Sequence, residues 1–259
     1  MSDRPPSPAV SHAVAILEYL AHTRPEASLT EIATDLSISK SSCLNILSTL
    51  ISSSMLTRAG NPPRYRLGPR LIELGRAAQR NSSYRFYVQR ELDSVLAKAK
   101  ATCIIAQRLA GNDGFVVIDR MAPRLPNDEQ TPPAAVGKVY PPFSPALGGA
   151  YLATLSDLEI AELVQVTGHS AHEYRILNRL PEIREKGFAW SIGEYLEDVN
   201  AIAVVLPRSE PQLIICLVAS SEHLRAEHID RWGAELVAAV ERIADSAPST
   251  STGLRGPFG

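Results

Sequence analysis

The segment from Ser28 to Leu50, "SLTEIATDLSISKSSCLNILSTL", limits the possible folds of this chain more than any other stretch. Apolar residues recur with helical spacing in two runs, and only "SIS" separates the runs. Ser28 and Glu31 have the capping-box spacing that is typical of a helix start. We therefore predict two short amphipathic helices with a very tight connection, the second beginning near Ser39.

The second predicted helix has two unlike faces. An apolar stripe of Cys43, Ile46, Leu47 and Leu50 would fix it to its neighbours. A helix that enters the DNA major groove needs short polar side chains at its N-terminal end, because bulk there would hold the backbone away from phosphates and base edges. Serine hydroxyls and free first-turn N–H groups can bind phosphate, and a lysine adds charge. The residues predicted at this end and on the opposite face are Ser39, Lys40, Ser41, Ser42, Leu44, Asn45 and Ser48.

A hairpin is predicted directly after these helices, with strands from Met55 to Arg58 and from Arg64 to Leu67 around the turn "GNPP". Such a hairpin would be a wing that lies near the DNA backbone or minor groove. The basic residues of the wing are Arg58, Arg64 and Arg66. The arginines that flank Tyr65 are expected to alternate between the two sides of the strand, so that only some of them face DNA.

Charge is distributed unevenly along the chain. The net charge is -2, yet residues 1–80 contain nine Lys/Arg against six Asp/Glu, and residues 81–259 contain seventeen against twenty-two. A mildly basic segment attached to an acidic one is typical of a phosphate-facing module. The alternative is a small helical subdomain with a solvated, serine-rich face. The wing and the charge asymmetry favour DNA binding.

The rest of the chain predicts an α+β domain with an antiparallel sheet flanked by helices. A helical segment starting at Pro69 and broken near residues 81–83 would lead into it. The predicted strands are Thr102–Leu109, Gly114–Arg120, a run within Val136–Pro142, Val199–Leu206 and Gln212–Ala219. The predicted helices outside the tight pair are Ser11–His22, Tyr84–Ala101, Pro145–Leu155, one from Ser156, Ile176–Gly187 and Ala226–Ala244.

Several classes of function are disfavoured. The apolar runs "AIAVVL" and "LIICLVA" are far below the roughly 18 residues of a membrane helix and predict buried strands. The N-terminus has no signal pattern, and three widely spaced cysteines fit core positions in a reducing cytoplasm. No nucleophile elbow, Walker loop or H-E-x-x-H motif indicates an enzyme. In "HSAHE", residues His169, His172 and Glu173 lack a further ligand nearby, so we expect a polar loop or helix start, and neither metal nor cofactor.

Several blocks, in one order, resemble the IclR family of bacterial transcription regulators. They are "LTEIATDLSISKSS", "RYRLGPRLIELG", "VGKVYPPFSPALGGAYLATLS" and "IREKGFAWSIGEYLEDVNAIAVVL". The resemblance implies a winged helix-turn-helix domain, a linker helix and a GAF-like C-terminal domain that binds a small-molecule effector. It also implies homodimers, often paired into tetramers, on palindromic double-stranded DNA operators near catabolic genes. The expected parts are a disordered tail at 1–9, the DNA-binding domain at 10–68, the linker helix at 69–83, the effector domain at 84–245 and a disordered tail at 246–259.

The chain departs from these relatives at Leu44 and Asn45, where many of them carry His-Arg. Arginine reads guanine, whereas asparagine suits adenine and leucine offers only apolar contact to a thymine methyl. We therefore expect a preference for A·T pairs where relatives read guanine. The cap residue Ser28 completes the set of expected DNA contacts.

Relatives that bind small carboxylic acids use the backbone at the positions of Ala146 and Leu147, together with side chains in "GFAWSIGE" and "DVNAIA". An acidic residue frequent after the "GYA"-like triplet is replaced here by Ser191 or Ile192. Aromatic residues in these regions suit a flat or aromatic acid better than a very small one, although each could equally be a core or rim residue. The expected effector-binding residues are Tyr140, Phe143, Ala146, Leu147, Trp190, Ser191, Tyr195, Val199 and Ala201.

An alternative makes the second domain an oligomerisation scaffold or a small-molecule-binding enzyme with an accessory winged helix. Apolar positions of the linker could pack against a partner chain in either case. These positions are Leu71, Ile72, Leu74 and Ala78. For a regulator, we expect two states: effector binding would change the dimer arrangement, and with it the spacing of the two recognition helices on a palindrome.

Overall fold

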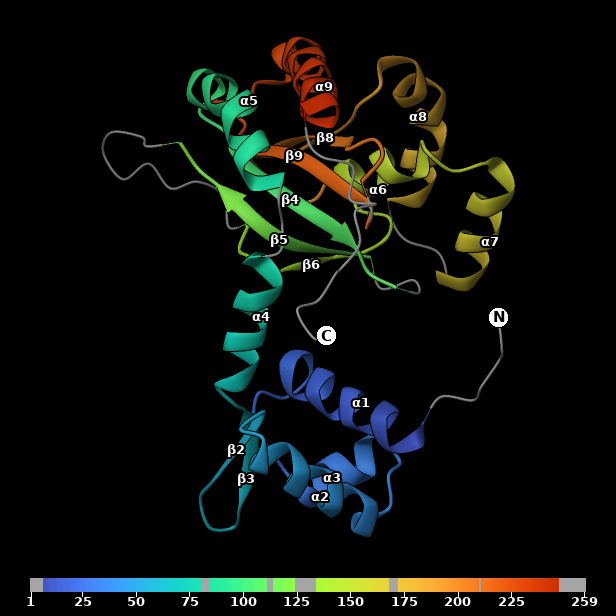
Figure 1. Cartoon of the computed structure of the whole chain (residues 1–259). Helices are drawn as coiled ribbons and strands as arrows, with labels where there is room; N and C mark the ends of the chain where they lie inside the picture. The colour runs from blue at the N-terminus through green and yellow to red at the C-terminus, as the bar shows by residue number, and fades with distance from the viewer. Residues whose placement is uncertain are drawn as a thin grey trace, which may run out of the picture. The chain divides into compact units, whose positions relative to one another are not determined.

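The structure is a computed structural model that describes residues 7–80, 84–110, 114–123, 134–167, 172–209 and 211–246. The chain divides into two compact units, residues 1–81 and 82–259, which can be followed by colour in Figure 1. Within the described ranges, no helix is long and apolar enough to cross a membrane.

The N-terminal unit combines helices with a small antiparallel sheet. The helices are α1 (Pro8–His22), α2 (Leu29–Asp35), α3 (Lys40–Ser52) and α4 (Arg70–Arg80), and the strands are β1 (Ala27–Ser28), β2 (Leu56–Ala59) and β3 (Arg64–Leu67). The strand order is β1-β3-β2. The tight helix pair and the hairpin after it are therefore both present, as predicted (Figure 1).

The predicted apolar stripe holds α3 in place. Cys43 and Leu47 are fully buried, Leu50 is nearly so, and Ile46 packs partly buried against the same core. Full burial of a leucine side chain stabilises a fold by about 1.5–3 kcal/mol, so the stripe fixes the orientation of the helix. The capping box of α2 is also confirmed.

The ends of the elements differ from the prediction at two places in this unit. α1 begins at Pro8, so part of the expected tail at 1–9 is helical, because proline is favoured in the first turn of a helix. Residues 1–6 lie outside the described ranges. β1 was not predicted, since two residues are too short to show a period; its Ala27 lies opposite Tyr65 of β3.

The C-terminal unit is built on a six-stranded antiparallel sheet with the order β6-β5-β4-β9-β8-β7. Its strands are β4 (Thr102–Arg108), β5 (Phe115–Met121), β6 (Val139–Tyr140), β7 (Ala189–Ile192), β8 (Val199–Val205) and β9 (Leu213–Ser220). Its helices are α5 (Tyr84–Ala99), α6 (Pro145–Leu152), α7 (Asp157–Thr167), α8 (Glu173–Lys186), the 3-10 turn η1 (Ala226–His228) and α9 (Ile229–Ser246). The predicted α+β class is confirmed.

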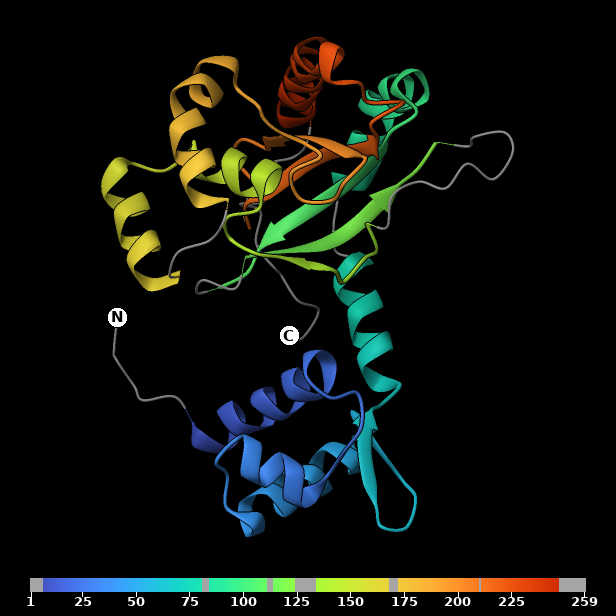
Figure 2. The ribbon, with the colours of Figure 1, turned by 180° about the vertical axis from the view of Figure 1, so that it is seen from behind.

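Helices cover both faces of this sheet, as Figures 1 and 2 show. On one face α5 and α9 pack against residues such as Ile105 and Leu217, and on the other face α6, α7 and α8 pack against residues such as Ile104 and Cys216. The central strands β4 and β9 are therefore buried on both sides. This explains why each strand contains a continuous apolar run, residues 103–106 in β4 and 213–219 in β9, rather than an alternation.

Some boundaries in this unit also differ from the prediction. The edge strand β7 was not predicted, because four residues after a glycine give a weak signal. α8 begins at Glu173, earlier than expected, and α6 ends at Leu152 rather than at Leu155. Residues 81–83, where the linker was expected to break, and residues 247–259 lie outside the described ranges.

Candidate functional site

The exposed face of α3 carries most of the residues predicted to contact DNA. Lys40, Ser41, Asn45 and Ser48 are exposed, and Leu44 is 46% exposed although it is apolar. The Ser48 hydroxyl donates to the Leu44 carbonyl at 2.8 Å, which keeps this side chain close to the helix. The face is thus rich in short side chains, and Lys40, Leu44 and Asn45 are its larger members.

The serines at the start of α3 hydrogen-bond to one another. Ser39 is the N-cap, and its Oγ accepts from the Ser42 N–H at 3.2 Å while its hydroxyl donates to Ser42 Oγ at 2.9 Å. Ser41 Oγ lies 3.3 Å from Ser39 Oγ. The Ser39 side chain is therefore engaged in capping, whereas the exposed Ser42 hydroxyl can still donate to a phosphate oxygen.

Ser28, the remaining predicted contact near the helices, has a structural role. Its Oγ accepts from the Glu31 N–H at 3.3 Å, and its N–H donates to the Glu31 carboxylate at 2.7 Å. These hydrogen bonds lower the pKa of the Glu31 carboxyl. Ser28 is half-buried, and both its N–H and its hydroxyl interact with Glu31.

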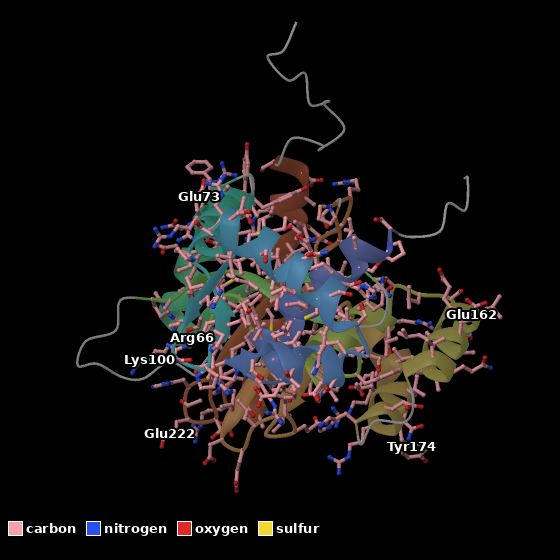
Figure 3. The ribbon with its side chains drawn as sticks, turned by 90° about the horizontal axis from the view of Figure 1, so that it is seen from below. Arg66, Glu73, Lys100, Glu162, Tyr174 and Glu222 are labelled. Atoms are coloured by element: carbon pink, nitrogen blue, oxygen red, sulfur yellow. The ribbon has the colours of Figure 1, made fainter. Side chains whose placement is uncertain are left out.

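The wing arginines differ from the expectation in their placement. Arg64 and Arg66 share one face of β3 rather than alternating, because side chains two residues apart on a strand point to the same side. Tyr65, between them, is 3% exposed and packs in the core. Both arginines pair with the Glu26 carboxylate: Arg64 Nε lies 2.9 Å from it, and Arg66, labelled in Figure 3, also contacts it.

Two cations of this surface, Lys40 and Arg58, have no carboxylate partner among the described residues. Lys40 on α3 and Arg58 on the wing are exposed and form no ion pair within the described part of the chain. A cation without an internal partner is available to phosphate at no cost of breaking a salt bridge. Among the predicted basic contacts, these two are therefore the best placed electrostatically.

The C-terminal unit contains a cavity between the sheet and the N-terminal end of α6. Its volume is about 50 Å³. Its lining residues are Ile104, Tyr140, Ser144, Pro145, Ala146, Leu147, Ser191, Tyr195, Leu196, Val199, Ala201, Cys216 and Val218. The cavity brings together Tyr140, Ala146, Leu147, Ser191, Tyr195, Val199 and Ala201 from the predicted effector set.

Two residues of the predicted set do not line this cavity. Phe143 is 2% exposed and packs in the core beside α6. Trp190 stacks near Phe188, with the cations of Arg179 and Lys186 over its ring. Both aromatic side chains thus have packing roles in this structure.

The sequence-based expectation also omitted part of the cavity wall. The omitted residues are Ile104, Ser144, Pro145, Leu196, Cys216 and Val218. Cys216 and Val218 alternate on β9, and Ile104 lies opposite Cys216 on β4, so they share one face of the sheet. Because these residues lie within continuous apolar runs of both strands, the sequence does not reveal which alternate residues face this cavity.

Two buried hydroxyls in the wall lack hydrogen-bond partners within the described residues. Ser144 Oγ lies at the start of α6 and Ser191 Oγ lies on β7, and both residues are 3% exposed. A buried polar group without a partner costs about 1–3 kcal/mol. A polar group of a ligand in the cavity would supply the missing hydrogen bonds.

The first turn of α6 adds free donors to the same wall. First-turn N–H groups have no acceptor within their helix, and the Gly148 N–H is the first in α6 to bond back, to the Ser144 carbonyl at 2.8 Å. Among the described residues, the N–H groups of Ala146 and Leu147 therefore have no acceptor, and both residues line the cavity. A helix N-terminus favours negative charge. The arrangement can bind a carboxylate without a cationic side chain.

The remaining wall is apolar or neutral. Burial raises the pKa of the Cys216 thiol to about 12, so the thiol stays protonated. Burial is also the main reason why the pKa of Tyr140 rises to about 12, which keeps its phenol a hydrogen-bond donor. The lining includes no charged residue.

The residues weighed for other chemistry are placed elsewhere. His172 is the N-cap of α8 and Glu173, its first residue, is 7% exposed, while His169 lies outside the described residues. Among the residues that the structure describes, no group of three or more His, Cys, Asp or Glu could hold a metal ion. All three cysteines are buried, as predicted.

Comparison with known proteins finds a family match for each of the two units. Residues 9–60 match the IclR helix-turn-helix domain, and residues 85–245 match the C-terminal domain of the bacterial transcriptional regulator IclR. The chain is 23% identical over 256 residues to the HTH-type transcriptional regulator XynR of Escherichia coli K12, covering 96% of this chain and 98% of XynR.

Solved structures of similar fold cover most of this chain. An IclR transcriptional regulator from Alicyclobacillus acidocaldarius has 27% identity and a TM-score of 0.76, over 92% of this chain and 98% of that one. An IclR homolog from Microbacterium hydrocarbonoxydans, solved in complex with 4-hydroxybenzoate, has 18% identity and a TM-score of 0.66, over 92% and 100% of the two chains.

Fold, surface and cavity together define a transcription regulator with an N-terminal DNA-binding helix-turn-helix domain and a C-terminal ligand-binding domain. The chain belongs to the IclR family of bacterial transcriptional regulators. The relatives it matches are regulators rather than enzymes.

Proposed function

We propose that this chain regulates a catabolic operon by binding a palindromic operator as a homodimer, able to pair into tetramers, and by sensing a small aromatic carboxylic acid. The observation that carries the proposal is the cavity at the start of α6, whose mostly apolar wall includes first-turn N–H groups and the Ser144 and Ser191 hydroxyls, which have no partner among the described residues. Such a site recognises one anionic group and an apolar body. We place the protein in the cytoplasm, where operator DNA lies.

On the DNA side, α3 would enter the major groove. Lys40, Ser41 and Ser42 would contact phosphates, and Arg58 would reach the backbone beside the wing. Arg64 and Arg66 are both ion-paired with Glu26, so they would contact DNA only by exchanging Glu26 for a phosphate. The further proposed contacts are Ser28, Ser39 and Ser48.

Leu44 and Asn45 would read bases from the exposed face of α3. Asparagine pairs with adenine and leucine contacts a thymine methyl, so A·T pairs should be preferred at these positions. Selection from a random duplex pool with the full-length protein should return a palindrome with A·T pairs in its contacted core. Asn45→Arg should move the preference toward guanine by about 5- to 100-fold. A G·C core ranked first by the unmodified protein would contradict this assignment.

On the effector side, the carboxylate would accept hydrogen bonds from the N–H groups of Ala146 and Leu147 and from the Ser144 hydroxyl. The ring would lie against the apolar floor, beside Tyr140 and Tyr195. A protein of the same fold binds 4-hydroxybenzoate, which supports an effector of this kind. The sheet residues Val199 and Ala201 would contact the ring.

The cavity volume favours a second candidate, a short aliphatic acid. About 50 Å³ is smaller than the ~150 Å³ of an engineered cavity that binds benzene. An aromatic acid therefore requires the wall to move outward, whereas a two- or three-carbon acid does not. The two candidates differ in the movement that they demand of Tyr140 and Tyr195.

Calorimetry on the full-length protein separates these candidates. Benzoate and 4-hydroxybenzoate should bind more tightly than acetate and pyruvate, and the bound acid should raise the melting temperature and change operator affinity. Tighter binding of the aliphatic acids would replace the aromatic assignment. If no acid of either series binds, the proposal of a carboxylate sensor is wrong.

A further inference from the structure

Two tyrosines from opposite edges of the C-terminal sheet meet at the cavity. Tyr140 belongs to the edge strand β6, and Tyr195 lies in the loop of residues 193–198 that follows the other edge strand, β7. Their ring centroids are 5.1 Å apart, and both rings line the cavity. The pair therefore closes over a floor made by the strands between those edges. We refer to Tyr140 and Tyr195 as the tyrosine cover.

The loop that carries Tyr195 is fixed at its base. The Gly193 N–H donates to Asn200 Oδ1 at 3.0 Å, and the Asp198 carbonyl accepts from the Ser221 N–H at 2.8 Å. At its tip, Leu196 lines the cavity and is 38% exposed, so this part of the loop lies between the cavity and solvent. A loop anchored at both ends can move at its tip without disturbing the sheet.

Lys138 contacts both rings of this cover and is not part of the cavity lining. Its Nζ lies 4.7 Å from the centroid of the Tyr140 ring and 5.5 Å from that of Tyr195. Its backbone is tied to β5, because the Val117 N–H donates to the Lys138 carbonyl at 2.9 Å. Within the described residues the ammonium has no carboxylate partner. Among the described residues, the two aromatic faces are therefore its electrostatic partners.

We propose that Lys138 is a positioning residue of the effector site, which holds the tyrosine cover closed by a cation–π contact to both rings. This proposal depends on the proposed function in one respect, because it takes the cavity to be the effector site. An effector larger than the closed cavity must displace the cover and so break at least one of the two contacts. Lys138 thereby sets how often the site opens.

Cavity opening can be measured without any effector, because Cys216 lies in the cavity wall. Cys103, on the adjacent strand, packs on the opposite face of the sheet and reports global opening. Full-length protein is pulsed with N-ethylmaleimide, and alkylation of each cysteine is followed by peptide mass spectrometry. Lys138→Met removes the charge at similar length, and Lys138→Arg retains a cation over the rings.

We expect Lys138→Met to raise the Cys216 alkylation rate at least about fivefold while Cys103 keeps its rate, and Lys138→Arg to stay within about twofold of the unmodified chain. An unchanged Cys216 rate in Lys138→Met, or a parallel rise at Cys103, would overturn the role of Lys138. In a second arm, saturating benzoate should slow Cys216 alkylation in the unmodified chain. Lack of protection there would count against the carboxylate effector and leave the first arm intact.

Discussion

Replacing Ser144 by alanine should raise stability and lower effector affinity at the same time. The Ser144 hydroxyl is buried, makes no cap hydrogen bond to α6 and has no other partner among the described residues. Alanine removes a desolvated polar group, which stabilises the ligand-free protein by up to about 2 kcal/mol. For a unit of this size, that gain raises the melting temperature by up to about 4–8 °C.

The same change removes a donor that we assign to the effector carboxylate. A hydrogen bond to a charged group contributes about 1.5–3 kcal/mol, so benzoate affinity should fall about 10- to 100-fold. Differential scanning calorimetry and isothermal titration calorimetry on Ser144→Ala measure the two effects separately. Ser191→Ala should likewise raise the melting temperature, since its hydroxyl is equally buried and unpartnered.

Ser209→Ala is the matched control. Ser209 is 7% exposed, but its hydroxyl donates to the Leu206 carbonyl at 2.8 Å and accepts from the Leu213 N–H at 2.9 Å. Its removal should lower the melting temperature and leave benzoate affinity unchanged. If Ser144→Ala destabilises the protein as Ser209→Ala does, the Ser144 hydroxyl is engaged within the fold and the reasoning fails.

Three further changes test other parts of the molecule. Arg58→Ala should weaken binding to all duplexes about equally and reduce the salt slope by about 1, measured by fluorescence anisotropy at several salt concentrations. The pKa of the Glu31 carboxyl is lowered in the folded chain, so the ionised carboxylate stabilises the N-terminal unit at pH values above the usual pKa of glutamate. This contribution is lost as pH falls through the lowered pKa. Glu31→Gln should remove that pH dependence of the unfolding free energy, measured by chemical denaturation between about pH 3 and 6. Gly233→Ala would put a Cβ 2.3 Å from the Phe188 ring, and such overpacking should cost about 1–3 kcal/mol in unfolding free energy.

Periodicity alone predicts the helix pair well, because one face of each helix is buried in a single core. On α3, the stripe of Cys43, Leu47 and Leu50 repeats every three or four residues, and no other element needs to be known to find it. The very short strands β1 and β7 give no such signal. They exist because a neighbouring strand offers pairing groups, which only the folded chain supplies.

The charges of the wing depend on long-range contacts. Glu26 lies 38 residues before Arg64 and 40 before Arg66, and β1 brings it beside both. A count of basic residues therefore overstates the free charge of this surface. Similarly, Tyr140 and Tyr195 could be proposed from the segments that resemble the family, but their meeting across the sheet follows from the strand order.

The pairing of the wing arginines affects how this regulator can be controlled. Nonspecific DNA affinity grows with the number of phosphates that free cations neutralise, with a slope of about 0.9 per contact in the logarithm of salt concentration. Because Glu26 engages Arg64 and Arg66, we expect fewer cations to contribute to nonspecific binding and Lys40 and Arg58 to have the larger share. Under the proposed function, operator binding would then depend more on base contacts and on half-site spacing. An effector that supplies a coupling free energy of only about 1–3 kcal/mol could then shift the equilibrium between DNA-bound and free protein. A uniformly basic surface would instead keep the protein on DNA with or without effector.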